Sequence, residues 1–377
     1  MVLVPGSLAL AAVVAFPQSH PASAPAPETA DLVRVAVAAL LSMEEKGEWP
    51  YEGVYRVPSK DGPAIPMGYR VGGTAIVATA LLHAGDPKDT AASAARDRAL
   101  SFVLGHLDDD VLAPSTVDVY DVRVWGQAYA LELLSHVSSR HAAGARAKPV
   151  AEWIPRLVSS LEAEQLDDGG WNYAGRAAQA SFVTAPVVQA LLFARAAGAT
   201  VKAKTFQRAK AALVASRTPQ LAFTYSGAFS GRSNDRRALV PGAIGRSPIA
   251  ASTLFLLGAG SVDEIQKTID DFHDHWEELD ARRQKPGTHE GPYGVAPYYF
   301  QYGHRYAAQA IELLPEGARA KERSRLREKL LRTRDDDGTW NDRVFPRSRN
   351  LGTAMAVLAL LGREAPLPPP LEERAAK

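Results

Sequence analysis

Cysteine is absent from this chain of 377 residues. Its absence excludes disulfides, thiolate metal ligands, a cysteine nucleophile and a lipid anchor on cysteine.

An excess of one charge is also lacking, because 43 Lys and Arg residues offset 42 Asp and Glu residues to a net charge of +1. That balance gives no overall attraction to nucleic acid or acidic lipid, so we expect no nucleic acid as partner.

Several catalytic signatures are missing as well. The chain contains no Gly-x-Ser-x-Gly nucleophile elbow, no His-Glu-x-x-His zinc motif and no phosphate-binding loop. We therefore expect no metal and no cofactor. What the chain does contain is ordinary globular composition, with 46% hydrophobic and 23% charged residues, and ample length for a large core.

The N-terminus has the pattern of an export signal. Leu8 to Phe16 is an apolar run of the usual length, and Ala22-Ser23-Ala24 fits a small-residue cleavage site, although no Lys or Arg precedes the run. We predict a signal peptide over 1–24 and a linker over 25–30, and hence a secreted or periplasmic protein. The alternative is a frayed apolar N-terminus. No other apolar run reaches the roughly 20 residues that a membrane span needs.

The rest of the chain alternates between two kinds of predicted helix. The first of each pair is charged on one face, and the second is apolar over most of its circumference, which is typical of a helix buried on several sides. Six such pairs are expected, at 31–45 with 72–84, 91–106 with 121–137, 151–165 with 181–197, 202–217 with 247–258, 262–280 with 299–314, and 318–333 with 350–361. Repeats of this length predict an all-α array of outer and inner helices, and six inner helices can close into a ring.

We therefore predict one toroid domain over 31–363 and a proline-rich tail over 364–377. Pro366 to Pro370 contains four prolines, which cannot continue a helix. The oligomeric state is left open by the sequence.

An acidic, glycine-containing turn followed by tryptophan ends several outer helices. It is clearest at Gln165 to Trp171, with Gly169 between them, and counterparts occur at Gly338-Thr339-Trp340 and Gly47-Glu48-Trp49. Glycine permits the positive φ that ends a helix, aspartate favours the turn, and tryptophan offers a large apolar area with one donor. We expect this motif to link an outer helix to the loop that follows it. A calcium site in the acidic turns is the alternative, but the spacing does not match an EF-hand.

The motif Gln165-x-x-x-Gly169-x-Trp171 resembles the QW repeat of squalene and oxidosqualene cyclases, which also occurs in protein prenyltransferase β subunits. The sixth unit has Arg334 and the first has Met43 at the glutamine position. The resemblance implies an (α/α)6 toroid, with a substrate cavity at the N-terminal ends of the inner helices. The chain lacks the Asp-x-Asp-Asp motif of the cyclases, and without cysteine it lacks the Asp, Cys and His zinc ligands of the prenyltransferases.

Three segments that lead into inner helices carry candidate ligand-binding or catalytic residues. The first comprises Asp118, Tyr120, Asp121, Arg123 and Trp125, in which either aspartate is an acid or base at the cavity or simply a helix cap. The second is the densest in aromatic and titratable residues and comprises His289, Glu290, Tyr298, Tyr299, Tyr302, His304 and Arg305. The third is basic and includes Arg246 and Arg349, which suit a carboxylate or phosphate.

The alternative for the second segment is packing of Tyr and His between inner helices, and the alternative for the third is a solvated loop.

We expect a protein that binds a small-molecule or extended apolar or glycan ligand in a central cavity. One alternative is a cyclase-, lyase- or hydrolase-type enzyme with Asp118, Asp121 and His304 as its acid and base groups. Another is a protein-interaction scaffold that uses the face of the ring.

Overall fold

The computed structural model describes residues 27–85, 89–115, 122–173, 178–231, 235–296 and 299–371. Within these ranges the chain forms fourteen α-helices and four short 3-10 helices, with no β-strand. Five outer elements each precede one inner helix: α1 (Pro27–Ser42) with α2 (Met67–Ala84), α3 (Thr90–His106) with α4 (Arg123–Ser139), α5 (Ala147–Ala163) with α6 (Ser181–Ala196), α7 (Ala203–Ser216) with α9 (Ser247–Leu256), and α13 (Glu316–Arg332) with α14 (Ser348–Leu361).

The remaining hairpin has an outer layer made of two helices. These are α10 (Val262–Asp274) and α11 (Trp276–Asp280), which precede the inner helix α12 (Tyr299–Ile311). The sequence predicted one helix over 262–280, and the structure breaks it at His275, whose backbone N–H bonds the Asp271 carbonyl oxygen. A single turn of helix, α8 (Val240–Ala243), lies in the loop before α9.

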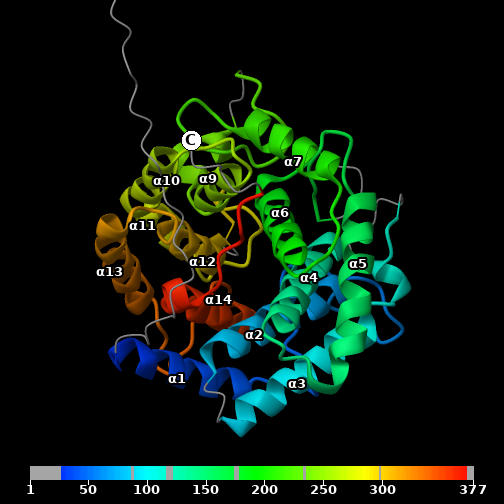
Figure 1. Cartoon of the computed structure of the whole chain (residues 1–377). Coiled ribbons are helices and arrows are strands. Elements are labelled where there is room, and N and C mark those ends of the chain that lie inside the picture. The colour runs from blue at the N-terminus through cyan, green and yellow to red at the C-terminus, as the bar shows by residue number, and fades with distance from the viewer. Residues whose placement is uncertain are drawn as a thin grey trace, which may run out of the picture.

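The hairpins form a closed ring (Figure 1). The inner helices follow one another around it in the order α2, α4, α6, α9, α12 and α14, and α14 packs against α2 to close the circle. The inner layer is buried throughout, as in α4 from Arg123 to Val137, whereas the outer α13 buries only Glu322, Leu326 and Leu330. The predicted all-α (α/α)6 toroid is confirmed.

Tryptophan links the outer and inner layers in three hairpins by the same pair of hydrogen bonds. The indole N–H bonds a carbonyl oxygen in the last turns of the outer helix, and the backbone N–H bonds a threonine hydroxyl on the inner helix. The three sets are Trp49 with Leu40 and Thr74, Trp171 with Leu161 and Thr184, and Trp340 with Leu330 and Thr353, all at 2.7–3.1 Å. The structural role expected for the acidic turns is therefore observed.

The glycines of these turns are needed where the backbone reverses. Gly169 has φ +96° and Gly338 has φ +85°. A Cβ atom on Gly169 would also lie 2.5 Å from the carbonyl oxygen of Arg208 on the next outer helix. Gln165 strengthens the same junction, since its amide donates to the carbonyl oxygens of Gly169 and Thr205.

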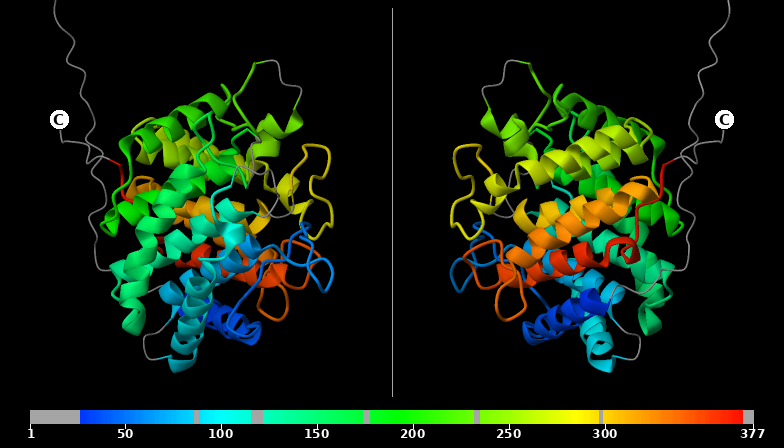
Figure 2. Two further views of the ribbon diagram at one scale, coloured as in Figure 1. Left: turned by 90° about the vertical axis from the view of Figure 1, so that its right-hand side faces the viewer. Right: turned by 90° about the vertical axis from the view of Figure 1, so that its left-hand side faces the viewer.

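The two ends of the ring differ (Figure 2). The long loops that lead into the inner helices lie at one end, which we call the entrance end. At the opposite end, the tail end, residues 364–371 cross the ring, and the backbone N–H of Leu371 bonds the Leu256 carbonyl oxygen. The prolines of this segment do not continue α14.

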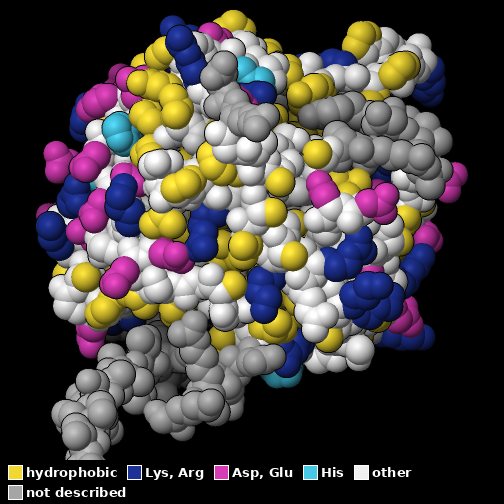
Figure 3. Space-filling view, turned by 90° about the horizontal axis from the view of Figure 1, so that it is seen from above, with side chains coloured by type: hydrophobic (Ala, Val, Ile, Leu, Met, Phe, Trp, Pro, Cys, Tyr) yellow, Lys and Arg dark blue, Asp and Glu magenta, His cyan; other side chains and the backbone are white. Residues whose placement is uncertain are grey.

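The surface agrees with the balanced composition. Acidic and basic side chains are interspersed over the face shown in Figure 3. Among the described residues, no helix combines the length and the apolar character that crossing a bilayer requires.

Candidate functional site

Side chains from opposite sides fill the middle of the ring. The ring order places α4 opposite α12, and the hydroxyls of Tyr129 and Tyr306 meet there at 3.1 Å. Towards the tail end, Arg305 of α12 forms an ion pair with Glu132 of α4. Towards the entrance end, the Tyr302 hydroxyl donates to the Phe182 carbonyl oxygen at 2.9 Å. The axis of the ring is therefore occupied by protein between these contacts.

The Glu132–Arg305 pair is a structural feature. Both side chains are buried, and His136 lies 3.7 Å from the Glu132 carboxylate. Burial alone would raise the pKa of Glu132, but Arg305 and then His136 outweigh it and hold that pKa below its usual value. The tail then covers this pair, because Pro366 and Leu367 line a small cavity of about 20 Å³ together with both partners.

Aromatic side chains gather at the entrance end instead, in two groups. The first aromatic group consists of Tyr51, Tyr69 and Trp125. The Tyr51 and Tyr69 ring centroids lie 5.0 Å apart, and those of Tyr69 and Trp125 lie 5.4 Å apart. Trp125 packs so closely on α2 that a Cβ atom at Gly72 would lie 2.3 Å from its ring.

The second aromatic group consists of Phe182, Tyr225 and Tyr299. Phe182 stacks on Tyr225 with centroids 5.1 Å apart and meets the Tyr299 ring edge-on at 5.3 Å. The half-buried Tyr225 also contacts the His289 ring at 4.8 Å and lies 4.6 Å below the Arg237 guanidinium. These side chains come from α6, from α12 and from two loops at the entrance end.

His289 is held as a neutral ring in this group. Its Nδ1 donates to the Gly294 carbonyl oxygen at 2.9 Å, which leaves Nε2 as the proton acceptor. Burial lowers its pKa, and the charges of Arg237 and Arg246 lower it further, although the bond to Gly294 opposes them. Glu290, the next residue, is half-buried, and its backbone N–H bonds the Val295 carbonyl oxygen.

Asp342 is a second buried acid of the described chain. It lies in the loop before α14 and is fully buried, and neither carboxylate oxygen accepts a hydrogen bond from another residue. Burial raises its pKa to about 7, although the neighbouring Arg343 guanidinium opposes the rise. Burial and the Asp342 charge together raise the pKa of the Tyr51 phenol well above its usual value, so Asp342 lies close to the first aromatic group.

His304 does not belong to these groups. Its Nδ1 donates to the Phe300 carbonyl oxygen at 2.6 Å, and its Nε2 accepts from the Trp276 indole at 2.9 Å. It is fully buried between α12 and the outer helices α10 and α11, and burial lowers its pKa to about 4. The expected acid or base role of His304 at the cavity is corrected: both nitrogens are used in packing the two layers together.

The predicted arginines also have structural partners. Arg123 pairs with Glu164 at 2.9 Å, and Arg246 donates to the carbonyl oxygens of Phe223 and Gly242. Arg349 pairs with Asp337 at 3.0 Å on the exposed turn before α14. These guanidiniums link segments of the protein, so the basic site expected at Arg246 and Arg349 is not formed in this geometry.

The structure therefore divides the predicted site residues. Trp125, His289, Tyr299 and Tyr302 come to the entrance end, whereas His304 points to the outer layer, Arg305 pairs with Glu132 towards the tail end, and Arg349, at the start of α14, is paired with Asp337. Asp118, Tyr120, Asp121 and Tyr298 lie outside the described residues. Sequence reasoning missed Tyr51, Tyr69, Phe182, Tyr225 and Asp342. For the four aromatic residues the available signal was their position in an inner helix or in the loop that leads into one.

No protein family matches the chain, and no curated protein does either. Solved structures do match. The inactive GH76A α-1,6-mannanase variant of Salegentibacter sp. HEL1_6, in complex with α-1,6-mannotetrose, is 11% identical with a TM-score of 0.59, covering 88% of this chain and 98% of that one. A variant of the type II terpene cyclase MstE from Scytonema, in complex with merosterolic acid A, is 15% identical with a TM-score of 0.51, covering 89% and 97%. These likenesses confirm the predicted toroid fold.

Proposed function

We propose that this protein binds a small molecule with an apolar face at the entrance end of its toroid. The strongest support is that the middle and the two ends of the ring differ in what occupies them. Paired side chains fill the middle and the tail covers one end, whereas the two aromatic groups gather where the inner helices begin. A ligand that approaches the ring from the entrance end therefore meets aromatic side chains, among them the half-buried Tyr225.

The chemistry of this surface favours a ligand that presents an uncharged, apolar face. Aromatic rings bind apolar faces, and isoprenoids and sugars both offer such faces. The neutral His289 supplies one acceptor, and Arg237 remains engaged with Asp235 at 2.8 Å. The two solved toroids carry ligands of these two classes, a mannotetrose in one and merosterolic acid A in the other.

Isothermal titration calorimetry with α-1,6-mannotetrose and with merosterolic acid A tests the proposal. We expect one of the two to bind, and Tyr225→Ala to weaken that binding about tenfold, because it removes the half-buried ring of the second aromatic group. Phe102→Ala is the matched control, since Phe102 is a partly buried aromatic residue of the outer α3. Equal weakening by both variants, or no binding of either compound, would contradict the proposal and favour the interaction-scaffold alternative.

A second candidate function, acid/base catalysis, is favoured by Asp342. A carboxyl group with a pKa of about 7 retains its proton near neutral pH and can act as a general acid. Product analysis after incubation with the compound that binds is the test. Conversion by the native protein and its loss in Asp342→Asn, with binding retained, would support catalysis, and equal conversion by both proteins would contradict it.

We also propose that the chain is exported and that its first 24 residues are removed as a signal peptide. The support is the sequence pattern of the apolar run and the cleavage site. Expression in a bacterial host, followed by N-terminal sequencing of the extracellular or periplasmic fraction, tests this. A mature chain beginning at Pro25 is expected, and recovery of the intact N-terminus from the cytoplasm would contradict it.

A further inference from the structure

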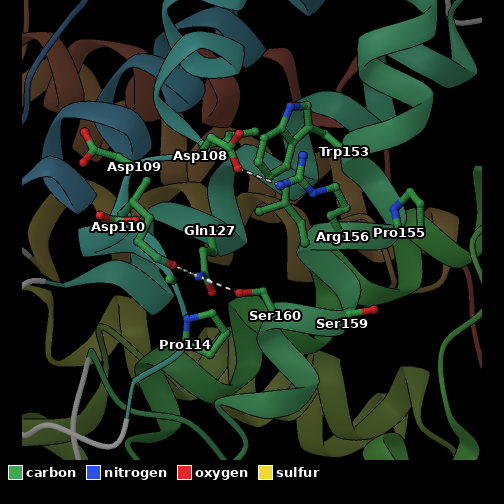
Figure 4. A pocket seen from close by; sticks show the side chains of 14 residues that line it. Asp108, Asp109, Asp110, Pro114, Gln127, Trp153, Pro155, Arg156, Ser159 and Ser160 are labelled. Carbon is green, nitrogen blue, oxygen red and sulfur yellow. Dashed lines mark hydrogen bonds and ion pairs between the residues drawn. The ribbon is translucent and has the colours of Figure 1, made fainter.

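A groove on the outer layer is separate from the two aromatic groups. It has a volume of about 600 Å³ and lies between the loop that follows α3 and the helix α5 (Figure 4). One wall carries Asp108, Asp109 and Asp110, and the other carries Trp153, Arg156 and Ser160. Gln127 of the inner helix α4 lies at the base between them.

The charges of the groove do not balance. Its lining contains three aspartates and one arginine, which gives a net charge of −2. Arg156 pairs with Asp108 at 2.7 Å and lies 3.7 Å from the centroid of the Trp153 ring. Asp109 and Asp110 form no ion pair in the described chain, and Arg70, whose pKa the Asp109 charge helps to raise, is itself paired with Glu48 at 2.6 Å.

Gln127 adds an independent observation at the base of the groove. It is about 98% buried, since only 2% of its surface is exposed. Its amide nitrogen donates to the Leu112 carbonyl oxygen and to Ser160 Oγ, the latter at 2.9 Å, but its Oε1 has no hydrogen-bond partner. A buried acceptor without a donor is costly, and a ligand that donates to Oε1 would remove that cost.

We propose that this groove binds an organic cation, an alkylammonium or guanidinium group. Such a group is positively charged and carries several N–H donors but no acceptor, which complements two unpaired carboxylates and an unpartnered amide oxygen. Trp153 and Asp108 already hold the guanidinium of Arg156 in this way within the protein. This groove and the binding site proposed at the entrance end are independent of each other.

The probes are spermidine, for a free polyamine, and N-acetyl-arginine amide, for the side chain of a peptide. The readout is the indole N–H resonance of Trp153 in an NMR titration, assigned with Trp153→Phe. We expect saturable shifts at low salt that weaken as salt is added, because exposed charges are screened. Tighter binding of spermidine identifies a free polyamine, and tighter binding of the arginine amide identifies a peptide; either result supports the proposal.

The chain offers a matched control for the acidic residues. Asp109→Asn with Asp110→Asn should weaken binding about tenfold, because it removes two exposed charge contacts. Asp335→Asn with Asp336→Asn changes a second aspartate triplet, also in the turn that ends an outer helix, and should leave binding within about twofold.

Gln127→Leu tests the unpartnered acceptor without changing the charge, and it should weaken binding about threefold. If this variant loses stability, the aspartate variants decide the matter on their own. No shift of the Trp153 resonance at millimolar probe, an equal loss in both aspartate variants, or an equal shift with neutral mannotetrose would each overturn the proposal.

Discussion

Two buried carboxylates, one on each side of the tyrosine contact in the middle of the ring, illustrate opposite ways of placing an acid in a protein interior. Glu132 faces Arg305 and His136, so it remains ionised and its pKa is lowered despite burial. Asp342 has a charged neighbour in Arg343 but accepts no hydrogen bond from another residue, and burial raises its pKa to about 7. The partner decides whether a buried acid stays ionised or keeps its proton near neutral pH.

The largest expected effect comes from removing the partner of Glu132. Arg305→Met would leave an uncompensated buried charge and should lower the free energy of unfolding by about 3–5 kcal/mol at pH 7. Urea denaturation measures this loss. The double variant Arg305→Met with Glu132→Leu should recover most of it, and a double variant as unstable as the single one would show that the pair is not what stabilises this part of the ring.

The second effect concerns Asp342, whose removal should raise the free energy of unfolding instead of lowering it. Because its folded pKa is raised from the usual 3.8 to about 7, the folded state keeps a proton that the unfolded state releases, and the free energy of unfolding falls as the pH rises through this range. Asp342→Asn should therefore increase the free energy of unfolding at pH 8 by up to about 3 kcal/mol and change it little at pH 4. Urea denaturation at both pH values measures the difference. A gain that is the same at both would contradict the raised pKa.

A smaller effect is expected from the cation beside Asp342. Arg343→Met removes the charge that offsets the raised pKa, and it also removes a hydrogen bond of 3.1 Å to the Pro286 carbonyl oxygen. The loss of stability should be larger at pH 8 than at pH 4 by about 1 kcal/mol. Repeating the substitution in the Asp342→Asn background is the control, because the pH-dependent part should then disappear.

The smallest effect is expected where no charge is involved. Tyr129→Phe removes the hydrogen bond between Tyr129 and Tyr306 in the middle of the ring, at a cost of about 1 kcal/mol that does not vary between pH 4 and pH 8. Thermal unfolding at the two pH values measures it. A strong pH dependence would indicate that this contact is coupled to one of the two carboxylates.

The helical repeat could be read from the sequence because it is local. Each outer helix has one charged face, each inner helix is apolar nearly all round, and Gly169 and Gly338 mark where outer helices end. The linking role of the three tryptophans followed for the same reason, since a glycine turn and a large donor-bearing side chain recur at one spacing. The break at His275 could not be predicted in this way, because the residues on both sides of it form helix and the sequence has no glycine or proline there.

The candidate site was predicted only in part, because the direction of a side chain depends on packing. Tyr299 and Tyr302 lie at the entrance end, but His304, two residues after Tyr302, points to the outer layer. Asp342 gave no signal in the sequence, where it follows Trp340 and Asn341 like any turn residue. Its raised pKa exists only because neighbouring segments exclude water and offer its carboxylate no donor.

The sequence by itself determined the helices and their pairing, apart from the break at His275, since hydrophobic periodicity and turn residues act over a few positions, and the number of pairs together with the family resemblance predicted the ring. Only the tertiary structure decided what lies along the axis of that ring. Tyr129 meets Tyr306 and Glu132 meets Arg305 across more than 170 positions of the chain, whereas Asp342 meets no donor. Hydrogen bonding and desolvation at such points depend on which distant residues come together. Such contacts fill the middle of the toroid, whereas the aromatic groups lie at its entrance end.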